Sequence, residues 1–163
     1  MDLFIQLIGF VAVAETLMIY QQPTQKRVLI MKLISDVLWA VHFTLLGAYS
    51  AAAIAIIGIA RETVFLFTEH HRQKWRILFL AISLASAFLT WKNWFSLLPA
   101  TASLLSVISF GQKKPRNTKL LAFPISLCMG TYSFMNGSWA NVVNEILTVG
   151  SAIIGLMRKE KKA

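Results

Sequence analysis

Several charged side chains lie inside long apolar stretches of this sequence, where an unpaired charge is costly. They are Glu15, Lys32, Asp36, Arg61, Glu62 and Glu145. In apolar surroundings such groups pair with one another, or they handle an ion, a proton or a polar solute. The rise of about 1.5 Å per helical residue places Glu15, Asp36 and Arg61 at one depth. The first half of the chain is therefore predicted to hold a cation and two carboxylates at a single level.

Two interpretations of these charges stay open. Lys32 and Asp36 are spaced i, i+4, so they share a helix face and can neutralise each other. Arg61 can then pair with Glu15 as a structural tie, in which removal of one partner strands the other charge. In the other interpretation these groups bind a solute or carry a proton. Glu62, about 100° around the helix from Arg61, is expected to lie on a different face.

A polar stripe marks the last apolar segment. It consists of Asn141, Asn144, Glu145, Thr148 and Ser151, which recur at helical spacing. The corresponding stripe in segment 50–68 consists of small residues and ends at Arg61. We consider two roles for the two stripes. Either they hold a small polar or zwitterionic solute between them, or the polar groups form hydrogen bonds between packed helices.

The composition indicates which elements position these residues. Apolar residues make up 56% of the 163 residues and charged residues only 14%, whereas soluble domains carry about 25% charged residues. Apolar segments occupy 3–20, 28–47, 50–68, 77–91, 94–111, 120–136 and 139–157. A membrane helix needs about 20 mostly apolar residues. The sequence therefore predicts an all-α membrane protein with seven transmembrane helices, whose main partner is the lipid bilayer.

The distribution of cations supports this count. If the segments alternate sides, thirteen of the sixteen Lys and Arg residues share one face, and Lys92 is on the other. Positive charge marks the cytoplasmic side, so the N-terminus is predicted outside and the C-terminus inside. These cations act as topology determinants, so the net charge of +9 does not predict a nucleic-acid partner.

Shifting the sequence by 90 residues reveals a common order of features. Gln22 falls on Gln112 in two polar loops, and Gly47 falls on Gly137 in two short turns. Two parallel three-helix repeats joined by a linker helix are the simplest interpretation. The predicted units are repeat 1 at 1–70, the linker helix at 71–92, repeat 2 at 93–158 and a basic tail at 159–163.

The same shift brings His42 onto Tyr132. Both residues are predicted a short distance below the outer surface, where they are candidates for an outer gate. Packing against a neighbouring helix is the alternative role for each.

The motif QQPTQKR at 21–27, the runs 32–39 and 42–48 and then Arg61 resemble the YgjV family of bacterial inner-membrane proteins. The order of helices also resembles the wider PQ-loop superfamily, which includes the SWEET sugar transporters. The YgjV resemblance implies a bacterial inner membrane location, for which the distribution of cations predicts a periplasmic N-terminus and a cytoplasmic C-terminus. The superfamily resemblance implies alternating access between two bundles. In SWEET-type transporters an Asn on the third helix of each half faces the solute. Asn144 matches that position, whereas Ile54 stands at its counterpart.

Other classes of function find little support. Cys128 is the single cysteine, which excludes a disulfide framework and a thiolate metal site. No catalytic motif, metal-ligand cluster or cofactor motif is present, so no enzyme is predicted. We predict a transporter of a small polar solute, with a non-transporting membrane receptor or assembly protein of the same fold as the alternative. Two halves on one chain permit a monomer, and a homo-oligomer stays open.

Overall fold

The computed structural model describes residues 3–45, 49–68, 71–89, 94–135 and 139–158, and these ranges contain helices and no strands. The helices are α1 (Leu3–Ile19), α2 (Gln25–Leu45), α3 (Tyr49–Phe67), α4 (Arg72–Leu89), the short 3-10 helix η2 (Trp94–Ser96), α5 (Leu97–Phe110), α6 (Pro115–Met135) and α7 (Trp139–Met157). The all-α prediction is confirmed for this part of the chain.

Three helices begin earlier than the apolar segments. α2, α4 and α6 start at Gln25, Arg72 and Pro115, three to five residues before segments 28–47, 77–91 and 120–136. Gln, Lys and Arg favour helices, and Pro is well suited to a first helical position. The Thr24 hydroxyl also accepts a hydrogen bond of 3.4 Å from the backbone N–H of Arg27. Hydropathy alone therefore underestimates the length of these helices.

The two halves of the chain have matching helices. α2 and α6 each contain 21 residues and begin 90 residues apart. α3 and α7 each contain 19 residues and also begin 90 residues apart. α2 packs between α1 and α3, and α6 packs between α5 and α7. This spacing equals the offset at which the sequence predicts the repeat.

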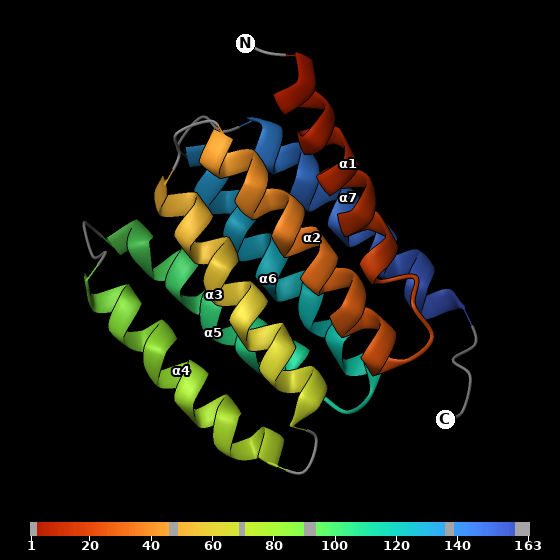
Figure 1. Ribbon diagram of the computed structural model, residues 1–163, viewed down its shortest axis with the longest axis vertical. Helices are drawn as coiled ribbons and strands as arrows, with labels where there is room; N and C mark the ends of the chain where they lie inside the picture. Colours follow the sequence, from red (N-terminus) through yellow and green to blue (C-terminus); the bar gives the residue numbers. More distant parts are fainter. Residues whose placement is uncertain (1–2, 46–48, 69–70, 90–93, 136–138, 159–163) are drawn as a thin grey trace.

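Figure 1 shows α1, α2 and α3 as one layer in front of α5, α6 and α7. α1 contacts α7 and α3 contacts α5, so the layers meet along both edges. α4 lies outside the layers and packs mainly against α5. The Phe65 and Phe79 rings, 5.8 Å apart and nearly perpendicular, join α3 to α4.

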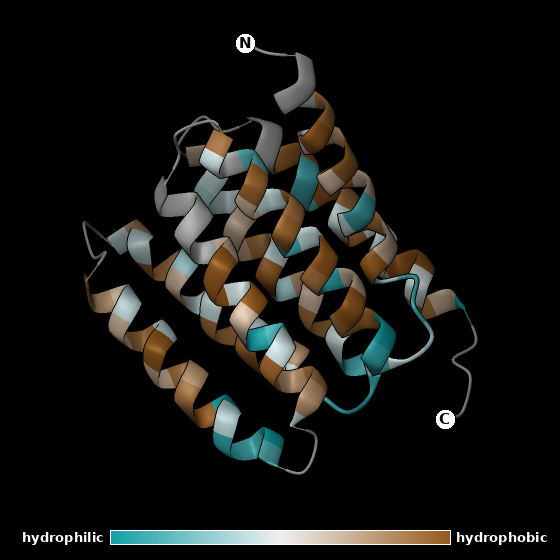
Figure 2. Cartoon of the chain, viewed as in Figure 1, coloured by the Kyte–Doolittle hydropathy of each residue, from teal (hydrophilic) through white to brown (hydrophobic). Residues whose placement is uncertain are grey.

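Hydrophobic residues predominate along the helices, and hydrophilic residues gather at one end of the bundle (Figure 2). Many of the large hydrophobic side chains are exposed. Phe67 is 82% exposed and Leu89 is 87% exposed, whereas Glu62 and Lys119 are at most 1% exposed. We call the end at which α2, α4 and α6 begin the basic end. Within the residues described here, no helix is both long and apolar enough to cross a membrane.

Candidate functional site

Four charged side chains of the first half form two ion pairs, which we call the charge cluster. Lys32 donates a hydrogen bond from Nζ to Oδ1 of Asp36 on the same face of α2. Arg61 donates from Nη2 and Nε to Oε1 of Glu62, at 2.8 and 3.1 Å. Asp36 and Lys32 lie within electrostatic range of the second pair. The cluster therefore joins α2 to α3 and carries no net formal charge.

Neighbouring residues hold the charge cluster in place. Gly58 of α3 faces Asp36, and a Cβ atom at position 58 would overlap the carboxylate. The ring of Phe110, at the end of α5, lies 5.7 Å from Lys32 Nζ and 5.4 Å from Arg61 Cζ. Cations near an aromatic face are attracted to its electrons. Phe110 thus brings the second half of the chain into contact with the cluster.

Two oxygen atoms of the charge cluster lack partners. Asp36 is 5% exposed and Glu62 is fully buried. Oδ2 of Asp36 and Oε2 of Glu62 accept no hydrogen bond from the described residues. Buried carboxylate oxygens normally have a donor. These two atoms are therefore positions at which a proton or a donor group of a solute can bind.

The predicted pairing of Arg61 with Glu15 is wrong. Arg61 pairs with Glu62, the adjacent residue that we expected on a different face. The guanidinium lies at the end of a long side chain, so it can bend around the helix to its neighbour. Glu15 is half-buried on α1 and forms no ion pair within the part of the chain that the structure describes.

The polar stripe of α7 faces the interior. Thr148 and Ser151 are buried, whereas Ile146 and Ile154 are exposed. The side chain of Asn141 lies outside the described residues. The burial pattern therefore places polar groups on the covered face of the helix.

Asn144 and Glu145 are half-buried. Glu145 lies near Ser126 of α6 and Asn144, although Ser126 Oγ has no hydrogen-bond partner among the described residues. A Cβ atom at Gly130 of α6 would lie 3.6 Å from Glu145 Cβ. This part of the stripe thus packs within its own half, and Glu145 forms no ion pair with Arg61 in the described ranges.

Tyr20 lies within electrostatic range of both regions, and no pattern in the sequence singles it out. This residue follows α1, is buried, and interacts electrostatically with Glu145, Arg61 and Asp36. Its position after an apolar segment suggested only an aromatic residue at a helix end. In the folded chain it lies within electrostatic range of charges from both halves.

His42 packs at the far end of α2 from the basic end. The residue is buried, and its ring lies 5.6 Å from that of Trp39 in an edge-on arrangement. A Cβ atom at Gly9 of α1 would lie 2.8 Å from His42 Cε1. Tyr132 is half-buried on α6. The role of these two residues as an outer gate stays a prediction.

Amide side chains join the two halves near the basic end, in an arrangement that we call the polar joint. Gln21 donates from Nε2 to the Ser151 carbonyl at 2.7 Å. Gln25 donates from Nε2 to the Phe110 carbonyl at 3.2 Å, and the Thr118 hydroxyl donates to Gln25 Oε1 at 3.0 Å. Both glutamines belong to the motif QQPTQKR. The glutamines of this motif are therefore the sequence feature from which the polar joint could have been predicted.

Lys119 is also part of the interior. The alternation of segments makes it one of the thirteen cations predicted on the cytoplasmic face, but it is 1% exposed. Its Nζ donates to the carbonyl of Gly155 on α7 at 2.9 Å. The side chain thus extends from α6 to α7. The two residues are too far apart in the sequence for helical spacing to predict this contact.

A family model described as Imp-YgjV, bacterial inner membrane protein, matches residues 3–163. The chain belongs to this family. It is therefore a bacterial inner membrane protein, as the resemblance of residues 21–61 implied. No curated protein and no solved structure matches the chain. Among the described residues of this family member, no group of three or more His, Cys, Asp or Glu side chains could hold a metal ion.

Proposed function

We propose that the protein is a multi-pass transporter of a small polar or zwitterionic solute, working by alternating access between two three-helix bundles. The observation that carries this proposal is the charge cluster with two buried, unpartnered carboxylate oxygens. Keeping charges inside an apolar helical protein is costly, and in membrane proteins such groups mark solute or proton pathways. The matching lengths and spacing of α2 with α6 and α3 with α7 support the division into two bundles.

The apolar exterior supports a position within the bilayer. Large hydrophobic side chains are exposed on every long helix, among them Phe10, Phe88, Leu127 and Ile146. Soluble proteins rarely expose contiguous apolar surface on this scale. We propose that the helical bundle, α4 included, is embedded in the inner membrane with the basic end on the cytoplasmic side.

This orientation predicts the side on which each terminus lies. A reporter that is active only in the cytoplasm should be active when fused after Ala163, because the cation-rich basic end stays inside. A reporter that is active only in the periplasm should be active when fused before Met1. Fusion activities on the opposite sides would contradict the orientation.

In this proposal the solute lies between the halves. Asp36, Glu62 and Arg61 bind it on one side, Tyr20 contacts it near the centre, and the α7 stripe of Asn141, Asn144, Glu145 and Thr148 lines the other side. A second group of residues carries a proton or exchanges ion-pair partners during transport. It consists of Glu15, Lys32 and Asp36. His42 and Tyr132 form the outer gate.

The polar joint defines which side is closed in this conformation. Hydrogen bonds from Gln21 to Ser151 and from Gln25 to Phe110 tie the halves together next to the basic end. Opening toward the cytoplasm requires these bonds to break. The buried backbone oxygens that they satisfy would then need water, which an open pathway supplies.

The alternative is a non-transporting receptor or assembly protein of the same fold. It is favoured by the local pairing of all four cluster charges. In this alternative the ion pairs hold α2 against α3 and bind no solute.

A thermal-unfolding screen of small polar metabolites against the purified protein separates the two functions. A transported solute binds the native state and raises its unfolding temperature. Glu62→Gln and Asp36→Asn keep the side-chain shapes but remove the negative charge, so they should abolish that stabilisation. Lys74→Gln, at an exposed position of α4 outside the charge cluster, is the control for a lost charge. Undiminished stabilisation in Glu62→Gln and Asp36→Asn would remove the cluster from the site.

A further inference from the structure

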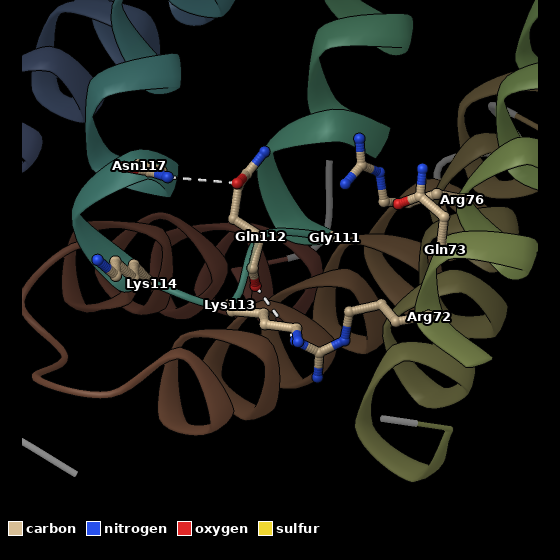
Figure 3. Close-up of a pocket in the computed structure, with 8 residues that line it drawn as sticks. All are labelled: Arg72, Gln73, Arg76, Gly111, Gln112, Lys113, Lys114 and Asn117. Atoms are coloured by element: carbon tan, nitrogen blue, oxygen red, sulfur yellow. Dashed lines mark hydrogen bonds between the residues drawn. The ribbon is translucent and has the colours of Figure 1, made fainter. Parts of the chain in front are cut away.

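A pocket of about 550 Å³ opens at the basic end, between the start of α4 and the turn that joins α5 to α6. Four cations line it: Arg72, Arg76, Lys113 and Lys114. Amide side chains contribute the rest of its polar surface, and none of the described lining residues is acidic. Figure 3 shows Arg72 and Arg76 extending from α4 toward the turn that carries Lys113. The transport proposal makes no use of this pocket.

Arg72 is fixed in the wall of the pocket. It is only 8% exposed. Its Nη2 donates to the Phe65 carbonyl at 2.9 Å, and its Nη1 donates to the Gln112 carbonyl at 3.2 Å. Its Nε is buried and has no hydrogen-bond partner. The guanidinium is therefore held by two backbone groups, and its Nε donor is left without a partner.

Arg76 lies one helical turn further along α4. Its Nε is likewise buried and lacks a partner. A Cβ atom at Gly111 would lie 2.5 Å from Arg76 Cδ and 2.7 Å from Cγ. The absence of a side chain at Gly111 thus lets the Arg76 stem cross the end of α5. Arg76 and Arg72 are held on the same side of the pocket.

The amide side chains are also ordered. Gln112 donates from Nε2 to the Ile108 carbonyl at 3.1 Å and accepts at Oε1 from Asn117 Nδ2 at 3.3 Å. These bonds fix the wall opposite α4. The pocket is thus built by side chains in defined positions from α4, α5 and α6.

We propose that this pocket binds the phosphate group of an anionic ligand. Guanidinium groups present N–H donors in a planar fork that matches phosphate oxygens, and lysines add point charges. Four cations, with no carboxylate among the described lining residues, attract an anion and repel a cation. The volume lies within the range of small-ligand sites, about 300–1,000 Å³.

Membrane orientation alone does not account for these features. A topology determinant needs only a charge near the cytoplasmic surface, and exposed residues such as Lys74 and Arg116 provide it. That role does not require Arg72 to be buried, two Nε atoms to lack partners, or Arg76 to pass close to Gly111. These features are expected of a site that holds N–H donors for an anion.

The phosphate can come from two sources, a lipid headgroup or a soluble phosphorylated compound. In the first arm of the test, the purified protein in uncharged detergent is titrated with inorganic phosphate against chloride of equal ionic strength. In the second arm, it is reconstituted in phosphatidylcholine vesicles with or without phosphatidylglycerol. The unfolding temperature is measured in both arms, because a ligand of the native state raises it.

Arg76→Gln should weaken the response by about tenfold in apparent affinity, since a charge-assisted hydrogen bond is lost. Lys113→Gln, at an exposed position, should weaken it as well, and it decides the outcome if Arg76→Gln fails to fold. Lys74→Gln removes the same charge from α4 outside the pocket, so it should respond as the unchanged protein does.

A response to phosphate beyond that to chloride supports a soluble ligand, and a response confined to phosphatidylglycerol vesicles supports a headgroup. Absence of both responses overturns the proposal. An equal loss in Lys74→Gln also overturns it, because the attraction would then be a property of the whole basic end.

Discussion

Replacing Glu62 with leucine should lower the free energy of unfolding by about 3–5 kcal/mol, because Arg61 then keeps a buried guanidinium without its partner. Glu62 is fully buried and accepts both hydrogen bonds of the pair at one oxygen. No other ion pair of Arg61 is present in the described ranges. Thermal or chemical unfolding of the purified protein in detergent measures the loss.

A double variant tests this reason. Arg61→Met with Glu62→Leu removes both charges together, and apolar replacement of a whole buried ion pair is often neutral or stabilising. The double variant should therefore unfold near the temperature of the unchanged protein. Glu15→Leu, at a half-buried carboxylate without an ion pair, should have a small effect. A double variant as unstable as Glu62→Leu would show that packing, and not the stranded charge, causes the loss.

The same double variant distinguishes structure from function. If the charges are structural ties alone, a folded protein without them keeps every solute response found for the unchanged chain. If Arg61 and Glu62 bind the solute, the protein folds but its stabilisation by solute disappears. The two measurements therefore separate the contribution of the Arg61–Glu62 pair to stability from its contribution to solute binding.

Helix positions were largely predictable from the sequence because the helices coincide with long apolar runs separated by short polar joints. The offset of 90 residues anticipated the matching starts of α2 with α6 and of α3 with α7. Helix starts were predicted less well. Gln25 and Arg72 are polar yet helical, and a hydropathy pattern does not detect helix propensity.

The site was predictable only where it depends on spacing within one helix. Lys32 and Asp36 pair as the i, i+4 spacing favours, and the α7 stripe faces inward as its period predicts. The depth of Arg61 was a poor guide to its partner, because depth along a helix says nothing about where a long side chain bends. Tyr20 and Lys119 join the interior through contacts between helices, which no local pattern contains.

The polar joint gives the glutamine-rich motif a physical role. Gln21 and Gln25 stand at the end of α1 and the start of α2, yet they bond to α7 and α5 of the other half. Amides both donate and accept, so they satisfy backbone groups at helix ends without adding charge. Such bonds hold the two halves together and can still be exchanged for water, which the proposed alternating access would require.

Replacing Gly155 with alanine should disrupt the contact of α7 with α1. A Cβ atom at position 155 would overlap the backbone carbonyl of Tyr20, which cannot rotate away as a side chain could. α7 must then shift from the end of α1, and the hydrogen bond of Gln21 to Ser151, one turn earlier on α7, is lost with it. Overpacking of this kind costs about 1–3 kcal/mol, measured as loss of unfolding free energy.

Gly150→Ala on the same helix is the matched control. A Cβ atom there meets nothing within 4 Å, so the change adds only helix propensity and should stabilise by up to about 1 kcal/mol. Gly155→Ala gains the same propensity and must lose more than that at Tyr20. Two variants of one substitution type should therefore change stability in opposite directions. Equal effects would mean that α1 and α7 do not approach closely at Gly155, and the polar joint would then lose its geometric basis.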